Sequence, residues 1–164
     1  ITSETKCPSC DGKLSWLFDF STIRGKITQR FLADSPERIL CCLHCSCFKP
    51  TYAGYDADGS EEWLAPFEKC QFQNYGERKA VVRHCNNLPF PPFACAEPFG
   101  IEDASTIGGV PMWLQHADFP RCIKCSQLTP FLAQLDNSTL GEEGIYYAFF
   151  CGHCRVSAVT YQQT

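Results

Sequence analysis

The chain has 164 residues, of which 45% are hydrophobic and 13% aromatic, enough to bury the core of one domain or of two small halves. Its formal net charge of −4 argues against a protein that grips nucleic-acid phosphates through a basic face. Charged residues make up 20%, a proportion that does not indicate disorder.

Cysteine is the unusual component, with thirteen residues. An odd number cannot close entirely into intramolecular disulfides, and a dense disulfide scaffold is typical of shorter secreted chains. The sequence has no signal peptide and no apolar run long enough to cross a membrane. We therefore expect reduced thiols, a cytoplasmic location and no membrane contact. The chain opens with Ile1 instead of Met, which leaves open a missing N-terminal segment.

Residues 1–60 are predicted to form a first zinc-ribbon-like β module. Two C-x-x-C pairs frame it, Cys7/Cys10 and Cys42/Cys45. In a zinc ribbon each such pair forms a turn, called a knuckle, that directs two sulfurs at one ion. Cys41 or Cys47 could replace a ligand, because cysteines crowd around the second pair.

Between these pairs, the aromatic run 14–20 predicts a strand, Gly25 a hairpin turn, and 27–32 a returning strand. Residues 40–48 then lead back to the metal, and 54–60 predict a loop with acidic residues.

Residues 61–108 are predicted to be an ordered linker rich in Pro and Phe. We expect a short helix over 61–64, ended by Pro66, and a strand over 79–83. Three further cysteines have no partner at ligand spacing, so we expect them in the core: Cys70, Cys85 and Cys95.

Residues 109–164 are predicted to form a second zinc-ribbon-like module. Its C-x-x-C pairs are Cys122/Cys125 and Cys151/Cys154, and strands are expected over 131–136, 145–150 and 156–161. The second knuckle of each module carries a histidine at the same position, His44 and His153, which we place outside the coordination sphere.

This parallel order predicts a tandem pseudo-repeat with a mainly β fold, little helix and one compact unit. Four thiolates in a tetrahedron favour Zn²⁺, with iron–sulfur chemistry as the main alternative. We therefore predict two structural zinc ions held by Cys7, Cys10, Cys42, Cys45, Cys122, Cys125, Cys151 and Cys154.

Residues 107–164 resemble a known family. The stretches are Ile107–Gln115, Phe119-Pro120, Phe131–Asp136 and Gly144–Phe150. They resemble the YwqG-like family, a bacterial domain of unknown function. The resemblance implies a β-rich, internally duplicated fold and no assigned activity. Relatives in that family occur in bacterial toxin systems and are regarded there as immunity proteins, so the resemblance also implies a toxin-neutralising role. Many members lack these cysteines, so the metal prediction depends on this sequence alone.

The sequence carries no recognisable enzyme motif: H-E-x-x-H, the H-x-E of zinc deaminases, a P-loop and G-x-S-x-G are all missing. A site closed by four cysteines leaves no position for a reacting water, so we expect no enzyme activity. Two alternatives stay open. One is an enzyme using a cleft between the modules, with His116 and Asp118, or His84 and Cys85. The other is a zinc-ribbon nucleic-acid adaptor in which Trp16, Phe18 and Phe20 stack on bases.

The combined reading is a non-enzymatic, zinc-stabilised protein that binds another protein, most specifically an immunity protein neutralising a bacterial toxin. The acidic net charge favours a basic partner. The acidic loop 56–62 and the knuckle tips are the predicted contact regions. The partner's identity and the oligomeric state do not follow from the sequence.

Overall fold

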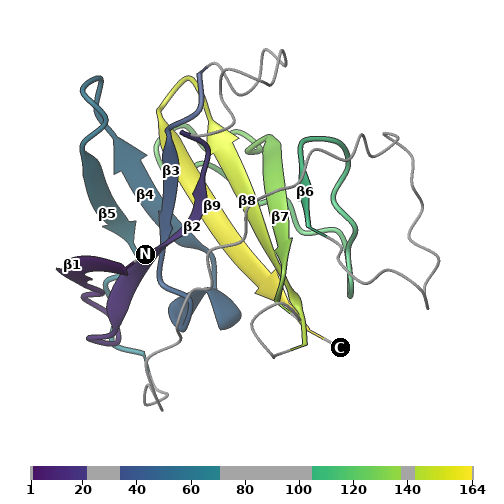
Figure 1. Cartoon of the computed structure of the whole chain (residues 1–164), viewed down its shortest axis with the longest axis horizontal. Coiled ribbons are helices and arrows are strands. Elements are labelled where there is room, and N and C mark those ends of the chain that lie inside the picture. The colour runs from purple at the N-terminus through teal and green to yellow at the C-terminus, as the bar shows by residue number, and fades with distance from the viewer. Residues whose placement is uncertain (1, 22–33, 71–104, 138–142, 164) are drawn as a thin grey trace.

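The computed structural model describes residues 2–21, 34–70, 105–137 and 143–163 (Figure 1). These residues form strands and one short 3₁₀ helix. In chain order the elements are β1 (Thr2–Lys6), β2 (Lys13–Asp19), β3 (Arg38–Cys41), η1 (Cys45–Cys47), β4 (Thr51–Tyr55), β5 (Glu61–Ala65), β6 (Thr106–Ile107), β7 (Phe131–Asp136), β8 (Ile145–Cys151) and β9 (Val156–Gln162). The prediction of a mainly β fold with little helix is confirmed for this part of the chain.

The strands form two antiparallel sheets. Sheet A has the order β1-β2-β3, and sheet B has the order β5-β4-β9-β8-β7-β6. Sheet B takes β4 from the predicted first module, β5 and β6 from the predicted linker, and β7 to β9 from the predicted second module. The two predicted modules are therefore joined in one sheet, where Thr51 of β4 pairs with Val159 of β9.

Most of the strands expected from the sequence are present. β2, β7, β8 and β9 agree with the predicted ranges to within a residue at each end. The helix expected over 61–64 is wrong, because these residues form β5 and pair with β4 from Tyr52 to Tyr55. A four-residue helix would satisfy few backbone groups, whereas the edge of β4 offers a full ladder of partners. The strands expected over 27–32 and 79–83 lie outside the described residues.

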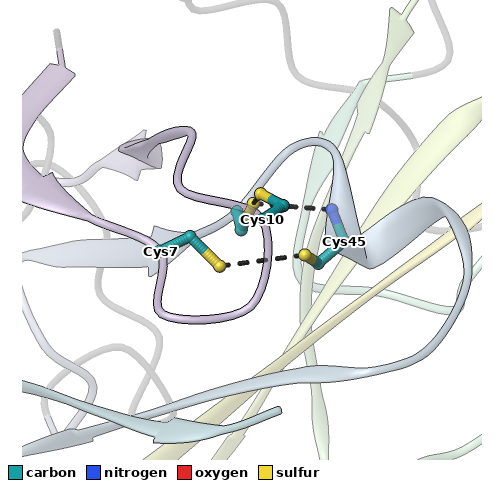
Figure 2. Close-up of side chains that lie close together, drawn as sticks. Cys7, Cys10 and Cys45 are labelled. Atoms are coloured by element: carbon teal, nitrogen blue, oxygen red, sulfur yellow. Dashed lines mark hydrogen bonds between the residues drawn. The ribbon is translucent and has the colours of Figure 1, made fainter. Parts of the chain in front are cut away.

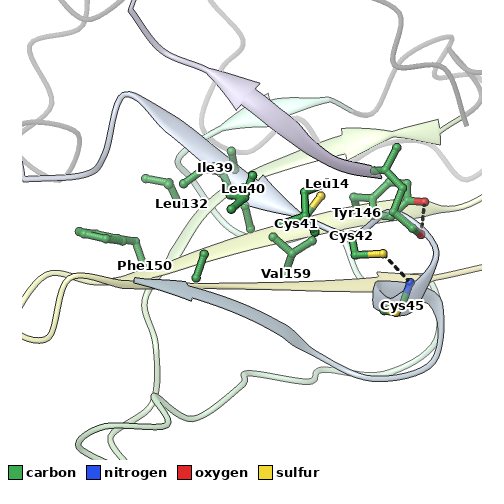
Figure 3. Packing of buried hydrophobic residues seen from close by; sticks show 14 of the residues in the cluster. Leu14, Ile39, Leu40, Cys41, Cys42, Cys45, Leu132, Tyr146, Phe150 and Val159 are labelled. Atoms are coloured by element: carbon green, nitrogen blue, oxygen red, sulfur yellow. Dashed lines mark hydrogen bonds between the residues drawn. The ribbon is translucent and has the colours of Figure 1, made fainter. Parts of the chain in front are cut away.

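β8 lies at the centre of the core because both of its faces are covered. Tyr146, Ala148 and Phe150 face sheet A, where they pack with a cluster that includes Leu14 and Ile39 (Figure 3). Tyr147 and Phe149 point to the opposite face and pack with Trp113 and Phe131. All seven residues of β8 are buried for this reason. A continuous apolar run in the sequence thus corresponds to a strand buried on both sides.

The outer face of sheet B is covered by residues 110–116, which we call the strap. Side chains of three neighbouring strands hold its backbone. Gln134 Oε1 accepts a hydrogen bond from Met112 N at 2.8 Å, and Gln162 Oε1 accepts one from Gln115 N at 3.1 Å. Between them, the Tyr147 hydroxyl donates to Met112 O at 2.7 Å and accepts from Leu114 N at 3.2 Å. Gln134 can be fully buried because its amide is paired in this way.

Candidate metal centres

The first candidate centre gathers four sulfurs at one end of the β8–β9 hairpin. Cys7 and Cys10 come from the turn between β1 and β2, Cys42 follows β3, and Cys45 begins η1. Cys7 Sγ lies 3.7 Å from Cys45 Sγ (Figure 2). Cys10 Sγ lies 3.5 Å from Cys42 Sγ. All four sulfurs lie within 4.8 Å of one another.

The second candidate centre lies at the opposite end of the β8–β9 hairpin, where Cys151 ends β8. Cys154 belongs to the turn into β9, and Cys122 and Cys125 form the knuckle that precedes β7. Cys125 Sγ lies 3.8 Å from Cys151 Sγ, and these four sulfurs also lie within 4.8 Å of one another. Tyr52 and Leu64 pack against this centre, so sheet B buries one side of it.

The first knuckle of each centre has the same backbone hydrogen bonds. Cys7 N donates to Gly12 O at 2.7 Å, as Cys122 N donates to Gln127 O at 2.8 Å. In both knuckles the residue four positions after the first cysteine has a left-handed backbone, with φ of 59° at Asp11 and 60° at Ser126. This bond-for-bond match supports the sequence comparison of these two knuckles.

The second knuckles differ. Cys45 starts a 3₁₀ helix. The Cys151/Cys154 knuckle is instead the connection of the β8–β9 hairpin and ends at Arg155, whose φ is 53°. What the two share is a hydrogen bond from the backbone of the later cysteine to the sulfur of the earlier one, at 3.4 Å from Cys45 N to Cys42 Sγ. Such N–H groups offset the negative charge of a thiolate.

Both centres have the dimensions of a one-ion site. A tetrahedron with Zn–S bonds of about 2.3 Å has an edge of about 3.8 Å, close to the sulfur separations in both groups. A disulfide would require about 2.05 Å, and all cysteines among the described residues are free thiols. The eight cysteines named from the sequence therefore form two groups, each of which could hold a metal ion.

The alternative ligands lie outside these groups. Cys41 is fully buried on β3 within the hydrophobic core. Cys47 Sγ donates to Leu43 O at 3.2 Å. His44 Nε2 lies 3.7 Å from Cys70 Sγ, and His153 is exposed at the tip of its knuckle. Cys42 and Cys45 thus complete the first group, as the repeat predicted.

The crowded thiols shift one another's pKa values. Hydrogen bonding from Cys42 lowers the pKa of Cys7, while hydrogen bonding with Cys45 raises the pKa of Cys42. In the second centre, a backbone hydrogen bond from Gln127 lowers the pKa of Cys125, and desolvation raises that of Cys154 to about 12. A thiolate is the form that binds a metal ion, so an ion must displace the protons of the thiols whose pKa is raised.

Metal affinity is consequently expected to fall as the pH falls. Protons compete for the sulfurs most strongly where the thiol pKa is raised, as at Cys42 and Cys154. We expect the loaded protein to release metal progressively as the pH is lowered from neutral, measured with a chromogenic chelator. The Cys47→Ser variant should release metal over the same range, because Cys47 lies outside both groups. Retention of both metals throughout this range would contradict the expectation.

The residues named for the other functions are placed differently. Phe20 is buried in the core, and Phe18 stacks on it at a centroid distance of 5.6 Å. Trp16 Nε1 donates to Glu61 Oε2 at 2.9 Å, and the Arg38 guanidinium lies 4.3 Å from its ring centroid. The three aromatic residues proposed to stack on bases are therefore not a free stacking surface, because the core and the edge of sheet B engage them.

The enzyme alternative names His116 and Asp118 as one pair, and His84 and Cys85 as another. His116, the last residue of the strap, and Asp118 are exposed, and the His116 carbonyl accepts a hydrogen bond from Gln162 Nε2 at 2.8 Å. Neither belongs to a metal-holding group. His84 and Cys85 lie outside the described residues.

Sequence reasoning did not anticipate the role of Arg155. Its backbone O accepts from Tyr55 N at 3.0 Å, and its side chain donates to Tyr55 O and to Asp56 O at 3.1 and 3.0 Å. These bonds join the second centre to the acidic β4–β5 hairpin. The only signal in the sequence is a basic residue directly after a C-x-x-C pair.

Within the described ranges, helices of the length and hydrophobicity needed to cross a bilayer do not occur.

In a comparison with known proteins, the chain aligns with part of a longer bacterial protein. No protein-family model and no solved structure matches it. A protein of Salmonella typhimurium named "Uncharacterized protein YpfL" is 33% identical to it over 171 residues, covering 96% of this chain. The chain spans 39% of that relative's length. The resemblance to the YwqG-like family stays a prediction, since these comparisons do not bear on it.

Proposed function

We propose that this protein is a zinc-stabilised, non-enzymatic protein-binding module that acts as a bacterial immunity protein against a basic toxin. The observation that carries the proposal is the closed form of both centres, each with four sulfurs within 4.8 Å of one another. Four protein ligands fill a tetrahedral ion, so no position is left for substrate or for a reacting water. Metal in such sites stabilises the fold, and function then depends on the surface.

Zinc is the ion that suits these groups best. Soft thiolate ligands in a small tetrahedron select zinc or iron, and the sulfur separations of 3.5 to 3.8 Å suit a single ion. A cluster of several irons bridged by sulfide would need its cysteine sulfurs further apart. Metal analysis of the purified protein tests this assignment, with two zinc ions per chain expected and iron as the contradicting result.

One end of sheet B offers a surface suited to a protein partner. Arg155 fixes the acidic hairpin, which carries Asp58 and Glu62, beside the second centre. The knuckle of that centre exposes Ile123 and Leu128, at 46% and 57%. Acidic side chains beside exposed apolar ones favour a partner that presents basic and apolar residues. The acidic loop and the Cys122/Cys125 knuckle, both predicted contact regions, thus lie at the same end.

The proposed immunity role is supported by the family resemblance in addition to this surface. An immunity protein must bind its toxin tightly and needs no chemistry of its own, which suits closed metal sites and an acidic surface. The direct test is growth. A basic partner captured from the cells of origin should inhibit a bacterial host when expressed alone, and co-expression of this chain should restore growth. A complex that forms but leaves the toxicity unchanged would overturn the immunity role.

Charge reversal tests the contact surface. We expect the double variant Asp58→Lys/Glu62→Lys to weaken the complex at least about tenfold, because like charges opposed across an interface cost several kcal/mol. The control is Glu68→Lys/Glu143→Lys, which changes the net charge equally at exposed positions away from this end. Isothermal titration of each variant with the purified partner gives the two affinities. Equal weakening by the two variants would contradict the placement, and co-purifying nucleic acid released by salt would favour the adaptor alternative.

A further inference from the structure

The first centre has a fifth thiol beside it. Cys70 follows β5 and contacts both knuckles of that centre at the same position of each. Its backbone N–H donates to the carbonyl of Ser9 at 2.9 Å, and its Sγ lies 3.7 Å from Nε2 of His44. Ser9 directly precedes Cys10, and His44 directly precedes Cys45. The segment carrying Cys70 is therefore tied across the two turns that present the ligands.

Further contacts fix this segment. The Ser9 hydroxyl donates to the carbonyl of Glu68, and Lys69 pairs with Asp11 at 3.2 Å. Cys10 and Cys70 both pack against the same hydrophobic cluster while staying partly exposed, whereas the other three ligands of the first centre are buried. Cys10 is thus the most exposed cysteine of the first centre, and we take it as the one that reacts with an oxidised sulfur at Cys70.

The second centre lacks this arrangement in the described part of the chain. The residues equivalent to Ser9 and His44 are Lys124 and His153, and both are exposed. The free cysteines outside the two groups are Cys41, buried on β3, together with Cys47 and Cys70, which lie near the first centre. The two centres are therefore alike in their ligands and unlike in their surroundings.

We propose that Cys70 is an oxidation site through which hydroperoxides release the metal of the first centre, an inference that rests on the metal occupancy proposed above. The Cys70 thiol attacks the peroxide O–O bond, giving a sulfenic acid at Cys70 and releasing water or an alcohol. The Cys10 thiolate then attacks the sulfenic sulfur, an S–S bond forms, and hydroxide leaves and takes a proton from solvent. The peroxide is reduced by two electrons and the two sulfurs are oxidised by two.

The consequence for the metal is direct. A disulfide sulfur is a poor ligand compared with a thiolate, so the first centre is left with three thiolates and its ion dissociates more readily. The second centre keeps its four thiolates under the same treatment. Oxidation would thus loosen the packing of sheet A on sheet B while the second centre stays intact.

The test uses the full chain carrying two zinc ions, so the initial metal count establishes occupancy separately. Hydrogen peroxide is added, zinc release is followed with a chromogenic dye, and free thiols are mapped by alkylation and mass spectrometry. We expect release of one zinc ion per chain, a Cys10–Cys70 disulfide, and newly exposed thiols only in the first centre. The Cys70→Ser variant should release this ion no faster than the second centre releases its own.

The matched control is Cys47→Ser, which removes another half-buried thiol near the first centre and should behave like the wild type. Either of two results would overturn the proposal. One is equal release from the wild type and Cys70→Ser. The other is release from both centres at the same rate.

Discussion

Replacing Cys151 with serine is expected to unfold the end of sheet B that carries the second centre. Cys151 is both a metal ligand in our assignment and the last residue of β8. Structural zinc contributes on the order of 10 kcal/mol to the folding of small domains, which is comparable to the whole stability of a domain. Loss of one thiolate weakens the binding of the ion, and the three remaining thiols are then left clustered without it. We expect zinc content to fall by one ion per chain and the cooperative thermal transition to shift far downward or to disappear.

His153→Ala is the control for this experiment. His153 lies in the same knuckle, is exposed and belongs to neither metal-holding group. Its replacement should change the unfolding free energy by no more than about 0.5 kcal/mol. Calorimetry combined with metal analysis distinguishes the two variants. A Cys151→Ser protein that melts as the wild type does would contradict a structural role for the second centre.

Replacing Gly144 with alanine is expected to destabilise the fold strongly. Gly144 precedes β8 with φ of 128°, a backbone conformation that L residues rarely adopt. A Cβ there would meet the hydroxyl of Tyr161 and lie 2.7 Å from the carbonyl of Gln162. That carbonyl belongs to the β8–β9 ladder and cannot move without breaking it. We expect a loss of about 2–4 kcal/mol, the sum of backbone strain and overpacking.

Gly152 provides the matched substitution. It also lies in a connection next to β8, but a Cβ there would meet nothing within 4 Å. Gly152→Ala should therefore leave stability within about 0.5 kcal/mol of the wild type. Urea unfolding of the metal-loaded proteins measures both changes. Similar midpoints for the two variants would mean that the close contact at Gly144 relaxes at little cost.

The sequence was most informative where the chemistry is local. A C-x-x-C pair specifies its own turn, so the eight cysteines of the two groups could be named without knowledge of the fold. Aromatic and β-branched runs such as Ile145–Cys151 have few alternatives to a strand. The order of the strands within the sheets could not be derived in the same way, because it depends on contacts between distant segments. The pairing of β4 with β9 is such a case.

The features that the sequence did not reveal depend on single long-range contacts. Glu61–Ala65 carries no strand pattern of its own and becomes β5 because β4 offers an edge. Cys70 has no ligand spacing, and only the folded chain places it between the two knuckles. The strap is likewise held by Gln134, Tyr147 and Gln162, whose partners are backbone groups elsewhere in the chain.

The position of β9 within sheet B has a consequence for biosynthesis. β9 lies between β4 and β8, and the buried hydrogen bond between Tyr55 and Ser157 joins residues 102 positions apart. As the ribosome extends the chain from its N-terminus, β4 emerges well before the strand that pairs with its second edge. Until β9 has been synthesised, the β4–β5 hairpin has one unpaired edge, and such an edge is prone to wrong pairing. Closing so long a loop is also slow, so we expect sheet B to form late and nearly in one step once β9 has left the exit tunnel.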